Sequence, residues 1–323
     1  MQEARNITMM GRTKPRYGGL TFTAEEPTTI TLVKQGSTAP AVTLEQSFNA
    51  KKWTPFNGSV TLAAKESVFL RAGAAGNTQF ATGPQAHNHF TATGRVAASG
   101  SIMSLLSKDY ETVEMTTTYT FAYLFDSCSK LTSAPDLPVT TLSIGCYRRM
   151  FYSCTSLAST PVLPATTLAN LCYHSMFQDC TSLITAPKLP ATTLAASCYN
   201  SMFNGCTSLT IPPPTLPATA LTGTSTYQQM FNGCLNLEKA PVICLTTTPS
   251  SSNQMRYMFD SCRKLKEIEI HITSWPSSAT AMGYWVSSVS STGTFKCPAA
   301  LGTDSTIARG ISRCPEGWTV VNV

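Results

Sequence analysis

The chain has 323 residues, enough for several units with cores of their own. Hydrophobic residues make up 42% of it and charged residues only 12%, about half the usual share, which indicates a folded chain with a neutral, hydroxyl-rich surface. The net charge of +6 is modest, and the basic residues are scattered without interleaved aromatics, so no nucleic-acid partner is expected.

The first 18 residues, MQEARNITMMGRTKPRYG, are basic and polar and match no later unit. No apolar core follows their positive charges, so they lack the pattern of a secretory signal peptide. No stretch of the chain approaches the roughly 20 apolar residues of a membrane span, and none is expected. We interpret residues 1–18 as a segment that docks on a partner. A disordered tail is the alternative, because termini are often disordered.

Residues 19–95 predict a small, sandwich-like all-β domain. Short runs such as LTFTA, TTITLV, SVTLAA and SVFLRA are separated by turn-forming stretches such as KQGS and FNGS. This alternation of short strands and turns is typical of a β-sandwich. Residues 96–120 are expected to cap the repeats that follow, because the end of a repeat array exposes apolar surface.

From residue 121 to residue 272 the chain repeats a unit of 26–28 residues about six times. Each copy has a Phe preceded by Met or Leu, then a Cys three residues later and a Leu three residues after that. A unit of this size cannot bury its own apolar residues, so copies must stack. The length lies within the range of leucine-rich repeats. The sequence therefore predicts a leucine-rich-repeat solenoid in which Phe151, Phe177 and Phe203 align along one axis.

Within a unit we expect a short helix and an extended segment, and hence an α/β repeat. Leu168, Cys172, Met176 and Cys180 recur every four residues, a spacing that would place them on one helix face. The stretch SLITAPKLP has a Pro in mid-run, which a helix does not tolerate, and is interpreted as a strand. Residues 273–323 are expected to close the array as a C-terminal cap.

The twelve cysteines belong mostly to the repeats. A buried free Cys packs as a small hydrophobe. Neighbours in a column point the same way rather than at each other, so packing is favoured over disulfide bonding. Cys297 and Cys314 lie outside the array and could pair in oxidising surroundings. The main column consists of Cys128, Cys154, Cys180, Cys206, Cys234 and Cys262.

The motif MFxxCxSLxxAPxLPATTLxxxCY resembles the leucine-rich repeats of the bacterial surface-protein type. These are called BspA-like and are common in gut Bacteroidetes and their phages. The resemblance covers about residues 121–272. It implies a leucine-rich-repeat fold and a role in adhesion or binding. GSIMSLLSKDY before the array and PEGWTVVNV after it are similar to segments that accompany such arrays in phage-borne and gut-bacterial proteins.

No catalytic, cofactor-binding or metal site is indicated by the sequence. His87 and His89 would share one strand face, but no Asp, Glu or Cys lies within ten residues to complete a metal site. The cysteines are interchangeable members of a repeat, whereas a Cys nucleophile would be a distinguished residue. Neither a phosphate loop nor a GxSxG pattern occurs. We therefore expect no enzymatic activity. The third alternative for function is an enzyme whose site is not visible in the sequence and forms only in the folded chain.

Variable polar residues follow the CY and MF pairs of each repeat. Stacked repeats would hold them at fixed intervals on one surface, suited to a glycan or a protein. The alternative is a solvated surface that varies because nothing constrains it. The candidate ligand-facing residues are Arg148, Arg149, Tyr152, His174, Gln178, Asn200, Asn204, Gln228, Asn232 and Arg256.

These observations favour a non-enzymatic recognition or display protein. We expect a phage virion component at the particle surface, such as a head fibre, a decoration protein or a tail-associated protein. Residues 1–18 would bind other virion proteins, and the repeats would bind a host surface protein or glycan. By analogy with virion components, a homotrimer is the expected assembly. The alternative is a bacterial cell-surface adhesin.

Overall fold

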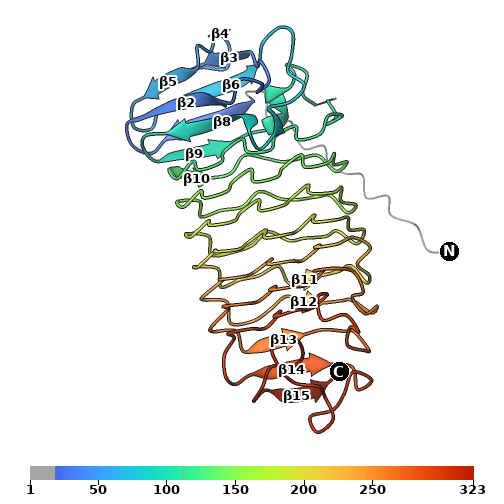
Figure 1. Cartoon of the computed structure of the whole chain (residues 1–323). Helices are drawn as coiled ribbons and strands as arrows, with labels where there is room; N and C mark the ends of the chain where they lie inside the picture. Colours follow the sequence, from blue (N-terminus) through green and yellow to red (C-terminus); the bar gives the residue numbers. More distant parts are fainter. Residues whose placement is uncertain (1–18, 112) are drawn as a thin grey trace, which may run out of the picture.

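The structure is a computed structural model and describes residues 19–111 and 113–323. A β-domain lies at one end, and the rest of the chain runs back and forth in successive layers beneath it (Figure 1). Within the described residues there are strands, turns and one 3-10 helix, η1 (Ile102–Leu105), but no α-helix. The fold is therefore almost entirely β, with repeated sheet pairings. Residues 1–18, which the sequence assigns to docking, lie outside the described residues.

The N-terminal domain consists of two sheets that share a core. Phe22 of one sheet meets Phe90 of the other edge to face, with ring centroids 5.2 Å apart. The six-stranded sheet has the order β10 (Leu131–Ser133), β9 (Val96–Ser99), β1 (Leu20–Ala24), β6 (Ser67–Ala72), β3 (Leu44–Ser47) and β4 (Thr54–Pro55). The four-stranded sheet has the order β5 (Ser59–Leu62), β2 (Thr28–Gln35), β8 (Ala86–Ala92) and β7 (Ala81–Gly83).

The first repeat joins the N-terminal domain through a shared sheet. β9 pairs antiparallel with β1 on one side and parallel with β10, the first extended segment of the repeats, on the other. The buried η1 follows directly, and the Ile102 N–H donates to the Asp136 carbonyl at 3.2 Å. The segment 96–120 thus supplies strand pairing as well as apolar cover to the first layer.

The expected helix within each repeat is wrong, and the structure has a run of tight turns in its place. Every fourth residue takes a left-handed backbone conformation, for example Gly145 (φ 62°), Arg149 (φ 53°) and Ser153 (φ 53°). An α-helix advances 100° per residue, so a period of four over twelve residues would rotate the apolar column by about 120°. The turns keep Leu168 and Cys180 buried on the same side, with 5% and 0% exposure. The α/β description of the repeat is therefore replaced by an all-β one.

Backbone N–H groups in these turns alternate between two kinds of partner. The N–H of Met150 donates within its own turn, to the Tyr147 carbonyl at 3.2 Å. The N–H of Phe151 donates to the next repeat, at 2.9 Å from the Met176 carbonyl. The turn from Tyr147 to Met150 has its positive φ at the third position, as in type II turns. Each layer is thereby bonded to the next along the whole turn segment.

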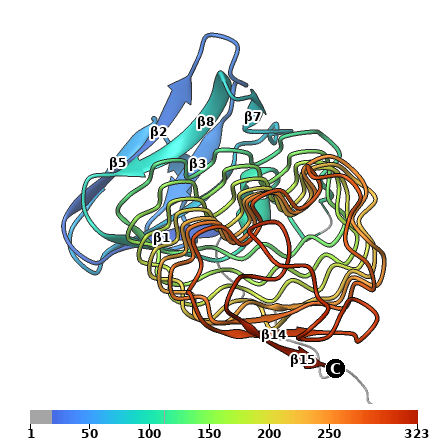
Figure 2. The same cartoon turned by 60° about the horizontal axis from the view of Figure 1, so that its bottom comes forward.

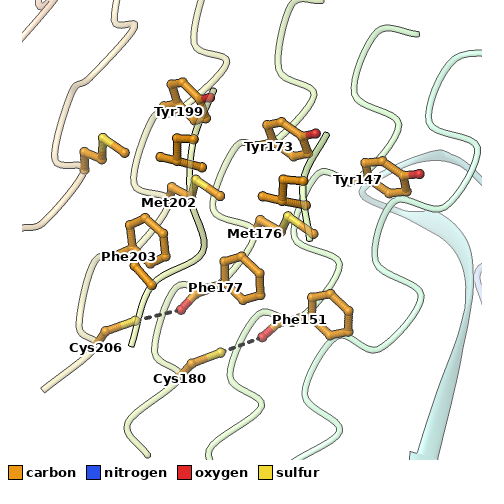
Figure 3. Packing of buried hydrophobic residues seen from close by; sticks show 14 of the residues in the cluster. Tyr147, Phe151, Tyr173, Met176, Phe177, Cys180, Tyr199, Met202, Phe203 and Cys206 are labelled. Atoms are coloured by element: carbon orange, nitrogen blue, oxygen red, sulfur yellow. Dashed lines mark hydrogen bonds between the residues drawn. The ribbon is translucent and has the colours of Figure 1, made fainter. Parts of the chain in front are cut away.

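The apolar columns align as the sequence predicts (Figure 3). Phe151, Phe177 and Phe203 are fully buried, with ring centroids 5.5 and 5.7 Å apart and planes within 4° of parallel. The tyrosine column is buried alongside, and neighbouring rings such as Tyr147 and Tyr173 lie 6.0 Å apart. Successive layers therefore lie over one another in register, which is also visible along the stack (Figure 2).

The cysteines are free thiols that pack in the core and also form hydrogen bonds. The Cys180 Sγ–H donates to the Phe151 carbonyl at 3.1 Å, and the Cys206 Sγ–H donates to the Phe177 carbonyl at 3.0 Å. The same hydrogen bond recurs from Cys154, Cys234 and Cys262, each to the carbonyl of the Phe in the immediately preceding layer. Cys297 and Cys314 are both free as well.

The opposite side of each layer is extended and carries short parallel pairings. These include single bridges, such as Thr185 with Ile211, and five strands. β11 (Thr215–Leu216) pairs with β12 (Val242–Ile243), and β13 (Glu267–Glu269), β14 (Thr294–Cys297) and β15 (Thr319–Asn322) form a three-stranded sheet. The segment 273–323 therefore continues the stacking. Its turns place Trp285 under Phe259, whose N–H donates to the Trp285 carbonyl at 2.8 Å.

Gly205→Ala and Gly233→Ala test the left-handed positions as a matched pair. Both glycines have φ near 70° (73° and 70°), where an Ala costs about 1–2 kcal/mol. A Cβ at Gly233 would have its nearest neighbour at 3.7 Å, whereas one at Gly205 would lie 2.2 Å from Asp179 Oδ1. We expect both variants to be less stable in urea unfolding, and Gly205→Ala more so. Unchanged stability in both variants would contradict a left-handed conformation at these two positions.

Thiol reactivity tests the packing of the cysteines. Burial raises the pKa of the Cys128, Cys146 and Cys198 thiols to about 12, which suppresses the reactive thiolate. Cys244 alone is half-buried among the twelve. We expect a chromogenic disulfide reagent at pH 8 to titrate Cys244 slowly in the native protein and all twelve thiols after unfolding without reductant. Rapid native reaction of several thiols would argue against the packed column.

Candidate functional site

The turns present two outward pairs of residues in each layer. In the layer of Phe151 these are Arg148–Arg149 and Tyr152–Ser153, which flank the buried Met150 and Phe151. The second residue of each pair is a left-handed position. Because the layers stack in register, equivalent pairs form columns along the stack. We call the surface formed by these columns the turn face.

All ten sequence-predicted ligand-facing residues lie on the turn face. Each is half-buried, so neighbouring groups hold its side chain while part of it meets solvent. From the first to the last of the five layers the face spans about 19 Å, at about 4.8 Å per layer. One column holds Arg148, His174, Asn200, Gln228 and Arg256; a second holds Tyr152, Gln178, Asn204 and Asn232; Arg149 belongs to a third.

The N-terminal end of the turn face is cationic and aromatic. The Arg149 guanidinium lies over the Tyr152 ring, 3.7 Å from its centroid. Its Nε lies 3.2 Å from Asp126 Oδ2, an ion pair with Asp126 from the preceding layer. For Arg148, in contrast, no carboxylate lies within ion-pair distance anywhere in residues 19–111 and 113–323.

The middle of the turn face carries amides, hydroxyls and glycine. Ser175 and Ser201 are nearly covered, at 4% and 7% exposure. Ser201 Oγ donates to Asn200 Oδ1 at 2.7 Å, and Asn232 Nδ2 donates to Asp260 Oδ2 at 3.2 Å. These layers present small polar groups at regular intervals, together with the carboxylates of Asp179 and Asp260. The amides and hydroxyls suit a ligand rich in hydroxyl groups.

The C-terminal end of the turn face has an aromatic pair that the sequence reasoning missed. Tyr257 and Tyr284 stack with ring centroids 5.4 Å apart, and Tyr284 is 46% exposed. The Arg256 guanidinium lies 4.7 Å from the Tyr257 centroid and donates to its hydroxyl at 3.1 Å. Tyr284 was missed because it lies in a layer whose sequence lacks the Met-Phe signature.

His87 and His89 lie together on β8, as their spacing predicts. Their ring centroids are 5.2 Å apart, and the His87 ring stacks on Tyr123 of the first layer at 4.6 Å. Burial lowers the pKa of both imidazoles, and the nearby Asp126 opposes that effect. Among the described residues, no group of three or more His, Cys, Asp or Glu side chains could hold a metal ion.

A separate groove of about 990 Å³ lies away from the turn face. It is formed where the β-domain and residues 110, 111 and 113–115 meet the extended side of the first two repeats. Met103, Met115 and Val162 provide apolar lining, and Glu114 and Asp136 provide negative charge. None of the ten predicted residues contributes to it.

The chain contains, over its described residues, no helix with the length and apolar character needed to cross a bilayer. No family model, no curated protein and no solved structure matches this chain. A functional proposal for the chain therefore depends on its own geometry.

The pH dependence of stability tests the environment of His174. Burial, with a further contribution from Arg148, holds its pKa at about 4, against an ordinary value of 6.5. Between these values the unfolded chain binds a proton that the folded chain does not, so stability falls as the pH drops from 6.5 to 4. For a half-buried group we expect a loss of about 1–2 kcal/mol.

His174→Asn should remove this part of the pH dependence, because Asn does not titrate. The repeat accepts Asn at this slot, since Asn200 occupies the equivalent position. The measurement is urea unfolding of the wild type and the variant at pH 4.5 and pH 7.5. Identical pH dependence in the two proteins would show that His174 titrates normally.

Proposed function

We propose that the repeats form a leucine-rich-repeat solenoid of the BspA-like kind and that the chain is a non-enzymatic recognition or display protein. It binds a host surface protein or glycan through the turn face. The observation that carries this proposal is the turn face itself, where ten half-buried polar side chains are held in register by backbone hydrogen bonds between layers. Such half-buried side chains lose less entropy on binding than fully exposed ones.

We further propose that the chain is a phage virion component, such as a head fibre, decoration protein or tail-associated protein, assembled as a homotrimer. The resemblance of the repeats to those of gut-bacterial and phage proteins supports this assignment. A bacterial cell-surface adhesin is the second candidate, favoured by the same repeats, and would use the same turn face.

Two measurements test this proposal. Mass spectrometry and immuno-electron microscopy of purified particles should find the chain on the virion, and light scattering should give the mass of a trimer. Detection on bacterial envelopes but not on particles would favour the adhesin.

Binding to host cells should depend on the turn face. The double variant Asn200→Ala with Asn204→Ala removes two neighbouring amides and should weaken cell binding at least fivefold. Val162→Ser, on the extended side at 79% exposure, is the control and should bind normally. Equal binding by all three proteins would refute a role for the turn face.

A further inference from the structure

Polar side chains from three parts of the chain converge where the β-domain meets the turn face. They come from β8, from the first layer and from the second layer. The group, which we call the junction cluster, consists of His87, His89, Tyr123, Asp126, Arg148 and Arg149. The three segments are at least 22 residues apart in sequence, so only the fold brings them together.

The cluster is held together by ring and charge contacts. His87 stacks on Tyr123 with planes 24° apart, and the Arg149 guanidinium lies 5.7 Å from the centroid of the same Tyr123 ring. Tyr123 itself takes a left-handed conformation, φ 64°, at a position filled by Ser175 and Ser201 in later layers. The same conformation recurs at the equivalent Arg149 and Tyr257, so it belongs to the turns of the repeat.

Unpaired polar atoms are concentrated in this cluster. His87 is only 7% exposed and Tyr123 only 2%. The described residues contain eight buried side-chain nitrogen or oxygen atoms without a hydrogen-bond partner in the protein, and five belong to the cluster. Each such atom costs about 1–3 kcal/mol if it stays unpaired. The five are His87 Nδ1, His89 Nδ1, Tyr123 Oη, Arg148 Nε and Arg149 Nε.

The charge of the cluster is positive. The cluster holds two guanidinium groups and one carboxylate, that of Asp126. Asp126 forms an ion pair with Arg149 Nε, but the geometry of this contact is not that of a hydrogen bond. Burial lowers the pKa of His87 and His89, so both imidazoles are neutral at pH 7. Arg148 therefore contributes a positive charge that no carboxylate of the described residues pairs.

A guanidinium and a phenol hydroxyl both donate hydrogen bonds, and their shared preference is for an oxyanion. The adjoining layers of the turn face present the amides of Gln178, Asn200 and Asn204, which suit hydroxyl groups. We propose that the junction cluster binds the oxyanion of an acidic sugar, a carboxylate or a sulfate ester, while the rest of the saccharide lies along the turn face. This inference rests on the proposed recognition function and names the chemistry of the ligand.

Isothermal calorimetry of the full chain with defined tetrasaccharides tests the inference. The probes are a tetragalacturonate for the carboxylate, a chondroitin sulfate tetrasaccharide and its desulfated form for the sulfate ester, and chitotetraose as a neutral chain. We expect at least one acidic probe to bind tenfold more tightly than chitotetraose, with weaker binding at higher salt. Comparison of the acidic probes distinguishes the carboxylate from the sulfate.

Arg148→Gln should reduce binding of the preferred acidic probe at least tenfold, and Tyr123→Phe should reduce it about threefold. Arg263→Gln is the control, because the Arg263 side chain is exposed, lies outside the turn face and lacks a carboxylate partner among the described residues. This control should stay within twofold of the wild type. Unchanged melting temperatures would show that the variants fold.

Three results would overturn the inference: equal affinity for acidic and neutral probes, equal losses in Arg148→Gln and Arg263→Gln, or no binding of any acidic probe. If host-cell binding still depends on Asn200 and Asn204 in any of these cases, the proposed recognition function stands while the acidic-sugar site fails. If cell binding is absent as well, both fail.

Discussion

The left-handed residue at every fourth position is the constraint on which the repeats depend. It turns the chain so that one N–H closes a turn and the next points to the layer below. The peptide groups of the turn segment are therefore satisfied without a helix or a long strand. Because the turn has a period of four, the apolar side chains return to the same side in every turn. The aromatic, Met and Cys columns follow from this geometry.

The two ends of the stack are closed by different means. At the N-terminal end, β9 and η1 supply a ready strand and apolar cover for the first layer. At the C-terminal end, Trp285 and the parallel pair β14 and β15 cover the layer of Phe259. Trp285 and Trp318 are buried, and these rings, larger than the stacked phenylalanines of the earlier layers, complete the core. Polar side chains, which this core excludes, lie at the surface, including the turn face.

Much of the fold could be predicted from sequence, because the spacing of Phe, Cys and Leu directly reports which residues stack. The ten outward residues were found for the same reason. The helix was wrong because a period of four was read as a helical face, whereas Arg149 and Ser153 mark left-handed turns. The seventh layer escaped notice because Val286 and Val289 stand where earlier layers have Phe and Cys. Nothing in the sequence links His87 to Tyr123, since their contact arises only from the packing of β8 on the first layer.

Each layer makes equivalent contacts with the next, and this equivalence has a genetic consequence. Loss of residues 173–198 would join Cys172 directly to Tyr199 and restore the CY pair, with every column still continuous and with Arg148 and Arg149 retained. Unequal crossing-over among these copies would thus shorten or lengthen the stack while leaving both terminal closures intact. The reach of the molecule can evolve separately from its chemistry at either end, by a change in copy number alone.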